Sequence, residues 1–202
     1  MENIKVLFLD IGGVLLSDGW NHHARKEAIA KFGLEEVQFQ KDHSVAFPLF
    51  ENGKLTLDEY LECVVFNVER DFTKAEFAEF MFSQSTQLPD FLPWLVEWKK
   101  HNNIRIFSIN NEGKEFNDYR ISKFNLHQVF DAFISSCEVG YSKPDPSIFK
   151  LALGIVQIEP QNCLYFDDRA IHVSIAKQLG LNAHVHQSFE QTKQILQQLK
   201  TA

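Results

Sequence analysis

Short apolar runs alternate with longer amphipathic stretches along this chain, and this alternation restricts the possible folds more than any other feature. Five runs have the length of buried strands, at residues 4–9, 104–109, 132–135, 163–166 and 183–186. Stretches of helical length separate most of these runs. Apolar strands that are joined through helices are typical of a parallel sheet with helices on both faces. The sequence therefore predicts an α/β protein whose core has three layers.

One long interval departs from the alternation. From about Ser17 to Leu88 the chain shows helical periods and no convincing strand, so we interpret residues 17–88 as a helical insertion in a core formed by residues 1–16 and 89–202. Thr56 with Glu59, and Thr73 with Glu76, have the spacing of a capping box, which predicts two helix starts. Apolar side chains at helical spacing are interpreted as core packing; they are Leu57, Tyr60, Leu61, Val64, Val65, Val68, Phe77, Phe80 and Met81.

Composition and charge exclude several classes of protein. The 202 residues are 45% hydrophobic and 23% charged, which is ordinary for a folded globular chain. A net charge of -7 repels polyanions, so we expect neither nucleic acid nor an anionic membrane as a partner. Cys63, Cys137 and Cys163 lie far apart without a C-x-x-C pair, which predicts reduced thiols. No apolar run approaches the roughly 20 residues that span a bilayer, and we expect a cytoplasmic protein.

Polar residues follow the predicted strands at four places. They are Asp10, Ser108, Lys143 in the segment GYSKPDP, and the pair Asp167–Asp168. Ligands of open parallel sheets bind beyond the carboxyl ends of the strands, where these side chains would meet. Two carboxylates about 4 Å apart repel by roughly 4 kcal/mol at an effective dielectric constant near 20. Lys143 offsets one charge, and a hard divalent cation, with Mg²⁺ favoured, would offset the rest.

The order and spacing of four motifs resemble those of the haloacid dehalogenase-like (HAD) hydrolase superfamily. The motifs are VLFLDIGGVLL, IFSINN, EVGYSKPDPSIF and LYFDDRAIHVSIAKQLG, and they span most of the predicted core. The resemblance implies a Rossmann-like core with an inserted helical cap, as in subfamily I. It also implies an Mg²⁺-dependent phosphatase that acts on a small phosphorylated metabolite, such as a sugar phosphate.

The resemblance also assigns roles to individual residues. Asp10 would be the nucleophile that forms an aspartyl-phosphate, and Ser108 and Lys143 would stabilise the transferring phosphoryl group. The metal ligands would be Asp10, the backbone carbonyl of Gly12, and Asp168, with Asp167 as a neighbouring or alternate ligand. Further residues are expected to bind substrate, namely Gly13, Asn110, His22 and His23. His172, four residues after Asp168, is equally consistent with a helix-face histidine and with a hydrogen-bond partner near the site.

Gly12 departs from the family pattern, because most phosphatases of the family have a second aspartate there as general acid and base. Losing such a group commonly costs about 10²- to 10⁴-fold in rate, and less for acidic leaving groups such as those of sugar 1-phosphates and acyl phosphates. His22 or His23 is a candidate replacement. Two alternatives stay open: a phosphoryl-ligand binding protein with little turnover, and a haloacid dehalogenase. Neither the individual substrate nor the oligomeric state follows from any motif.

Overall fold

A five-stranded parallel sheet forms the centre of the protein. In a computed structural model that describes residues 4–199, its strands are β1 (Val6–Leu9), β2 (Arg105–Asn110), β3 (Ala132–Ser135), β4 (Cys163–Asp167) and β5 (Asn182–Val185). The strand order is β3-β2-β1-β4-β5. All five predicted strands are present, with ends that differ by at most two residues from the prediction. The predicted α/β fold with a parallel sheet is confirmed.

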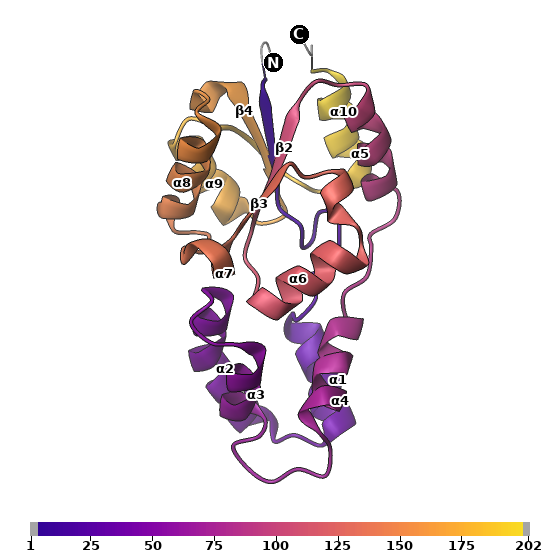
Figure 1. Ribbon diagram of the computed structural model, residues 1–202, viewed down its shortest axis with the longest axis vertical. Coiled ribbons are helices and arrows are strands. Elements are labelled where there is room, and N and C mark those ends of the chain that lie inside the picture. Colours follow the sequence, from indigo (N-terminus) through magenta and orange to yellow (C-terminus); the bar gives the residue numbers. More distant parts are fainter. Residues whose placement is uncertain (1–3, 200–202) are drawn as a thin grey trace.

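Helices cover both faces of this sheet. α5 (Phe91–Lys100), α6 (Lys114–Lys123) and α10 (Phe189–Gln197) contribute to the apolar cluster on one face, and α8 (Pro146–Val156) and α9 (Ala170–Gln178) to the cluster on the other (Figure 1). Three short elements complete the core, η1 (Leu126–Gln128), α7 (Ser136–Val139) and η2 (Pro160–Asn162). Side chains of a strand alternate between faces, so Leu7 and Leu9 pack in the first cluster and Val6 and Phe8 in the second.

Four helices lie between β1 and α5 and extend from one end of the sheet (Figure 1). They are α1 (His22–Phe32), α2 (Glu36–Glu51), α3 (Leu57–Val64) and α4 (Lys74–Ser83). We call residues 22–83 the helical insertion. Its apolar cluster is built around side chains such as Phe39, Tyr60 and Phe77, and Trp20 and Phe116 join this cluster from outside the insertion. The boundaries at residues 17 and 88 stay a prediction.

The ends of the insertion's helices agree with the predicted caps in most respects. Both predicted capping boxes are formed, at the starts of α3 and α4. The stripe that we extended from Leu57 to Val68 is wrong at its end, because α3 stops at Val64 and the side chain of Val68 is exposed. Val65 follows the helix as its C-cap and is still buried.

The chain enters and leaves the insertion through two segments that lie side by side. The backbone N–H of Ser17 donates to the carbonyl of Thr86 at 2.8 Å, and that of Leu88 donates to Leu15 at 3.0 Å. This pairing fixes the insertion beyond the carboxyl end of β1, which is where Asp10 lies. No helix within residues 4–199 has both the length and the apolar character needed to cross a bilayer.

Candidate active site

Three carboxylates and one ammonium group meet at the carboxyl ends of β1 and β4. One oxygen from each of Asp10, Asp167 and Asp168 lies within 4.8 Å of the others. The Nζ atom of Lys143 lies 3.0 Å from Oδ2 of Asp10 and 2.7 Å from Oδ2 of Asp167. Residues that are as much as 158 positions apart in the chain (10 and 168) are therefore neighbours in space.

Asp167 is fully buried and accepts hydrogen bonds at both carboxylate oxygens. Its donors are the Lys143 ammonium group, the Tyr165 hydroxyl and the backbone N–H of Arg169, the last at 2.8 Å, while Nδ1 of His172 lies 3.0 Å away. Burial opposes ionisation of Asp167, but Lys143 and His172 hold its pKa well below the ordinary range. Of the two readings left open for His172, the structure supports the hydrogen-bond partner.

Asp10 is also buried, with the charge of Asp167 nearby. Burial is the main cause that raises the pKa of Asp10 to about 7, the neighbouring charge of Asp167 adds to the shift, and Lys143 opposes it. Oδ1 of Asp10 accepts from the backbone N–H of Ile11 at 2.7 Å, which fixes the orientation of the carboxylate. Oδ2 contacts Lys143 alone among the residues from 4 to 199. A cation beside Oδ2 would favour the ionised, nucleophilic form.

Asp168 completes the acidic cluster, and its negative charge has fewer compensating partners than that of Asp167. Burial raises its pKa, and the charges of Asp167 and Asp18 raise it further. Within residues 4–199 its carboxylate accepts no hydrogen bond from a side chain or a backbone N–H. Gly13 leaves room for the Asp168 carboxylate, because a Cβ atom at position 13 would lie 2.7 Å from Cγ of Asp168. Gly13 also has φ +68°, a conformation that favours glycine.

Lys143 is held in place by the end of β2 and the start of α8. The amide of Asn111 donates to the carbonyl of Lys143 at 2.9 Å and accepts from its backbone N–H at 2.8 Å. Asp145 caps α8 by accepting from the N–H of Ser147, and Pro146 occupies the first helical position. The sequence KPDP thus starts a helix and aims the lysine at the acidic cluster.

A cavity of about 570 Å³ opens above the cluster, between the sheet and the helical insertion. The sheet side contributes Asp10, Gly12, Asn111, Glu112, Arg120, Lys143, Pro144, Asp168, Arg169, Ile171 and His172. The insertion and the segment that leads into it contribute Asp18, Trp20, Asn21, His22, Arg25, Phe47 and Glu51. Of the predicted site residues, those that line the cavity are Asp10, Gly12, His22, Lys143 and Asp168.

Other predicted site residues lie outside this lining. Ser108 is fully buried, and its hydroxyl group donates to Oδ1 of Asn110 at 2.9 Å. Asn110 donates in turn to Asn117, so both residues belong to a buried hydrogen-bond network that is not part of the cavity lining. His23 is on the outer surface of α1, where it pairs with Glu27 at 3.1 Å. The roles predicted for Ser108, Asn110 and His23 stay predictions that this arrangement does not favour.

Several cavity residues were missed in the sequence. Asn111 and Glu112 directly follow β2, and inspection of two more residues after that strand would have found them. Asp18 follows the first motif closely. Glu51 is the last residue of α2 and carries no local signal, because only the packing of the insertion against the core brings it to the cavity.

Arg120 joins the core to the segment that leads into the insertion. Its guanidinium group donates to Oε2 of Glu112 at 2.6 Å and to the carbonyl of Ser17. Burial raises the pKa of Glu112, and Arg120 opposes that shift. The pair is nearly inaccessible, so Glu112 is held as a partner of Arg120.

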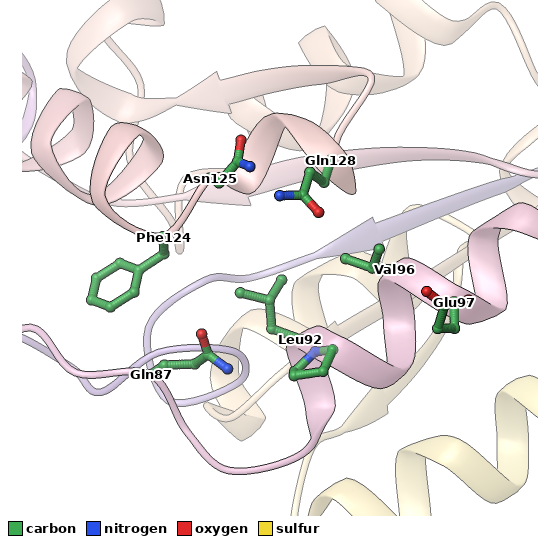
Figure 2. A pocket seen from close by; sticks show the side chains of 8 residues that line it. Gln87, Leu92, Val96, Glu97, Phe124, Asn125 and Gln128 are labelled. Carbon is green, nitrogen blue, oxygen red and sulfur yellow. The ribbon is translucent and has the colours of Figure 1, made fainter.

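A second pocket, of about 400 Å³, lies on the side of the core between α5 and the segment that follows α6 (Figure 2). It is lined by Gln87, Leu92, Pro93, Val96, Glu97, Phe124, Asn125 and Gln128. Glu97 is the one ionisable residue among them, and none of the predicted site residues takes part. The candidate site is therefore the cavity above Asp10.

Comparison with known proteins identifies the family. The sequence model of the haloacid dehalogenase-like hydrolases matches residues 4–180. The protein belongs to the haloacid dehalogenase-like hydrolase family. Among the solved structures of HAD proteins, an enzyme from Bacteroides thetaiotaomicron in its magnesium complex superimposes with a TM-score of 0.78 at 21% identity, over 91% of this chain and 93% of that one. The same enzyme has been solved with magnesium and inorganic phosphate, with a TM-score of 0.74 at 20% identity over 90% and 93% of the two chains.

Two curated relatives match different lengths of the chain. D-ribitol-5-phosphate phosphatase of Bacteroides thetaiotaomicron is 26% identical over 196 residues, which are 88% of this chain and 89% of the relative. The bifunctional epoxide hydrolase 2 of Sus scrofa is 42% identical over 56 residues, which are 28% of this chain. The matched part is 10% of that longer protein.

Proposed function

We propose that this HAD hydrolase is an Mg²⁺-dependent phosphatase that removes the phosphoryl group from a small phosphomonoester through an aspartyl-phosphate on Asp10. The observation that carries the proposal is the contact of one buried ammonium group, Lys143, with both Asp10 and Asp167 at the floor of a cavity. A lysine in this position stabilises a negative charge that develops near Asp10, because its ammonium group is desolvated and already oriented.

The residues present fit a magnesium ion. Carboxylate oxygens are the ligands that Mg²⁺ prefers, and three of them lie within 4.8 Å of one another. Asp10, Asp168 and the carbonyl of Gly12 would hold the ion. The four donors around Asp167 suit it better to fix the position of Lys143 than to bind metal. A bound Mg²⁺ would neutralise charge on the phosphoryl oxygens and orient the group for attack.

The chain's own residues supply the remaining steps. The Asp10 carboxylate attacks phosphorus, the bond to the leaving oxygen breaks, and water then releases inorganic phosphate from the aspartyl-phosphate. Lys143 compensates the charge of the transferring group. The insertion forms the other wall of the cavity and limits access of bulk water, which strengthens these electrostatic contacts.

A small, polar phosphorylated metabolite suits the cavity. Its wall holds several charged groups, among them Arg25 and Arg169, and two large aromatic side chains, Trp20 and Phe47. Two similar proteins support this class of substrate. One relative is a D-ribitol-5-phosphate phosphatase, and the similar solved structure from Bacteroides thetaiotaomicron holds magnesium and inorganic phosphate. A sugar phosphate or sugar-alcohol phosphate is therefore the first choice.

A screen for phosphate release tests the proposal. We expect the wild-type protein to release phosphate from at least one member of a panel of sugar, sugar-alcohol and acyl phosphates with Mg²⁺, and to lose this activity with EDTA. Asp10→Asn should abolish turnover with the fold unchanged. Asp71→Asn, at an exposed position outside the cavity, is the matched control and should retain full activity. Equal activity of the wild type and Asp10→Asn would contradict the mechanism.

Gly12 favours a second candidate, a protein that binds phosphorylated ligands with little turnover, because this position carries no proton donor. Binding of inorganic phosphate or an alkyl phosphate in the presence of Mg²⁺, together with no phosphate release across the panel, would support that candidate. Release of chloride from 2-chloro acids without a metal would instead support the third candidate, a haloacid dehalogenase.

A further inference from the structure

The cavity contains no ionisable side chain at position 12, so a leaving group there must receive its proton from elsewhere. Four carboxylates besides Asp10 line the cavity, those of Asp18, Glu51, Glu112 and Asp168. Glu112 is held in an ion pair with Arg120 at 2.6 Å. Asp168 belongs to the acidic cluster that suits a cation. Among the carboxylates, this leaves Asp18 and Glu51 as candidates for proton transfer. His22, the predicted replacement that also lines the cavity, is exposed at the start of α1.

The end of α2, which carries Glu51, is fixed against the core on both sides of that residue. The hydroxyl of Ser136, which follows β3, donates to the backbone carbonyl of Glu51 at 2.6 Å. Before Glu51, the ring of Phe50 lies against Gly113, where an added Cβ atom would come within 2.1 Å of it. After Glu51, a Cβ atom at Gly53 would lie 2.2 Å from the carbonyl oxygen of Cys137.

These contacts join the insertion to the segments that follow β2 and β3, and Figure 1 shows α2 meeting the core beside α7. Gly53 permits a close approach to the backbone of Cys137 and Gly113 a close approach of the Phe50 ring, and a Cβ atom at either position would clash. The backbone of Glu51 is therefore held at one position over the cavity. Asp18, by contrast, is exposed and lies in the segment that enters the insertion.

We propose that Glu51 is the general acid and base of this HAD hydrolase, replacing from the helical insertion the carboxylate that Gly12 lacks. This inference rests on the proposed phosphatase function and adds a catalytic residue to it.

The electrostatic surroundings suit this role. Burial is the main cause that raises the pKa of Glu51 to about 7, and the negative charges of Glu112 and Asp10 raise it further. Arg169 and Lys143 face the same carboxyl group and oppose the shift. A carboxyl group whose pKa is near the working pH serves equally well as proton donor and as acceptor.

Protons and bonds balance over the two steps. In the first, Asp10 forms a bond to phosphorus, the bond from phosphorus to the substrate oxygen breaks, and protonated Glu51 gives its proton to that oxygen, which leaves as an alcohol. In the second, the Glu51 carboxylate takes a proton from water as the water oxygen bonds to phosphorus. The bond between phosphorus and Asp10 breaks, inorganic phosphate leaves, and Glu51 is protonated again.

Leaving-group dependence tests this assignment. We would compare kcat/KM for 4-nitrophenyl phosphate, whose leaving group is acidic, with kcat/KM for the alkyl phosphate that the wild type hydrolyses fastest. Since kcat/KM reports the steps up to release of the alcohol, Glu51→Gln should lower it by about 100-fold or more for the alkyl phosphate. For 4-nitrophenyl phosphate, whose leaving group departs without protonation, kcat/KM of this variant should fall less than about fivefold.

Two further readouts separate proton transfer from a structural role. In Glu51→Gln, loss of the base slows the second step, so 4-nitrophenyl phosphate should give a burst of one nitrophenolate per active site and a protein heavier by one phosphoryl group. In the wild type, kcat/KM for the alkyl phosphate should fall as pH rises through about 7 and Glu51 loses its proton. Glu51→Gln should not show this fall.

Two variants serve as comparisons. Glu36→Gln changes an exposed glutamate in the first turn of the same helix and should leave both kcat/KM values unchanged. Asp18→Asn should lower kcat/KM for both substrates by the same factor. Three results would overturn the assignment while the phosphatase function stands. In Glu51→Gln, kcat/KM could fall equally for both substrates or not fall at all. Alternatively, a loss of kcat/KM that depends on the leaving group could be confined to Asp18→Asn. A wild type that hydrolyses neither phosphate would overturn both proposals.

Discussion

The ammonium group of Lys143 lies 2.7 Å from Oδ2 of Asp167, and both side chains are almost completely excluded from solvent. Desolvation alone would disfavour both charges, so the contact persists because further groups share it. Asp10 approaches the same ammonium group at 3.0 Å, and three other donors surround Asp167. The cluster is therefore a structural feature of the HAD core as well as the candidate site of reaction.

Replacing Lys143 with Met should destabilise the protein, because Asp10 and Asp167 would lose their shared counter-charge while remaining buried. We expect a loss of about 3–5 kcal/mol in the free energy of unfolding, measured with urea at pH 7. Lys114→Met removes a lysine that also contacts two carboxylates but is 47% exposed, and should cost about 0–1 kcal/mol. Equal losses in the two variants would contradict this account of the cluster.

The sequence predicted the sheet well, because apolar strands and the polar residues after them are local patterns. It placed Asp10, Lys143 and Asp168 correctly at one edge. Ser108 shows the limit of the pattern, since it pairs in register with Leu9 rather than Asp10, and β2 continues to Asn110. The first residue of the loop that reaches the cavity is therefore Asn111.

Features that depend on packing between distant segments could not be read from the sequence. Glu51 reaches the cavity only because Phe50 and Gly53 fit against backbone of the core. Nothing near Glu51 in the sequence marks these partners, which lie more than 60 residues further along the chain (Gly113 and Cys137). The end of α3 was missed because no glycine or proline follows Val64 closely.

Gly13→Ala should weaken metal binding through Asp168. Gly13 has φ +68° and Gly33 has φ +61°, so alanine at either position costs a similar backbone strain of about 1–2 kcal/mol. At Gly33 no atom lies within 4 Å of the added Cβ atom, whereas at Gly13 it would displace the Asp168 carboxylate. Calorimetric titration with Mg²⁺ should show at least about tenfold weaker binding in Gly13→Ala and no change in Gly33→Ala.

Asp168→Asn should have opposite effects on stability with and without metal. In the metal-free protein the negative charges of Asp167 and Asp18 disfavour ionised Asp168, so the amide should raise Tm. With Mg²⁺ at 100 times its Kd, the wild type should gain about 2.7 kcal/mol of stability, and the variant much less. Thermal unfolding with Mg²⁺ and with EDTA measures both effects. A larger Mg²⁺-dependent gain in Asp168→Asn than in the wild type would rule out Asp168 as a ligand.

Acidification should destabilise the protein through His43, a buried residue of the helical insertion. The indole of Trp20 donates to the Tyr60 hydroxyl at 2.9 Å, and this hydroxyl lies 2.8 Å from Nδ1 of His43. Burial, with a smaller effect of the Arg25 charge, lowers the pKa of His43 to about 3.

The sign of the pH effect follows from this shift. The unfolded chain has an ordinary histidine pKa of about 6.5 and binds a proton below that pH, whereas the folded chain resists protonation down to about 3. The contribution of His43 to stability is therefore complete above pH 6.5 and declines as pH falls toward 3. His43→Gln keeps a hydrogen-bonding partner for the Tyr60 hydroxyl but does not titrate, so its urea midpoint should fall less between pH 7 and pH 5 than that of the wild type. His23→Gln, at an exposed histidine, should follow the wild type. Parallel pH profiles of His43→Gln and the wild type would show that the insertion tolerates a charged histidine.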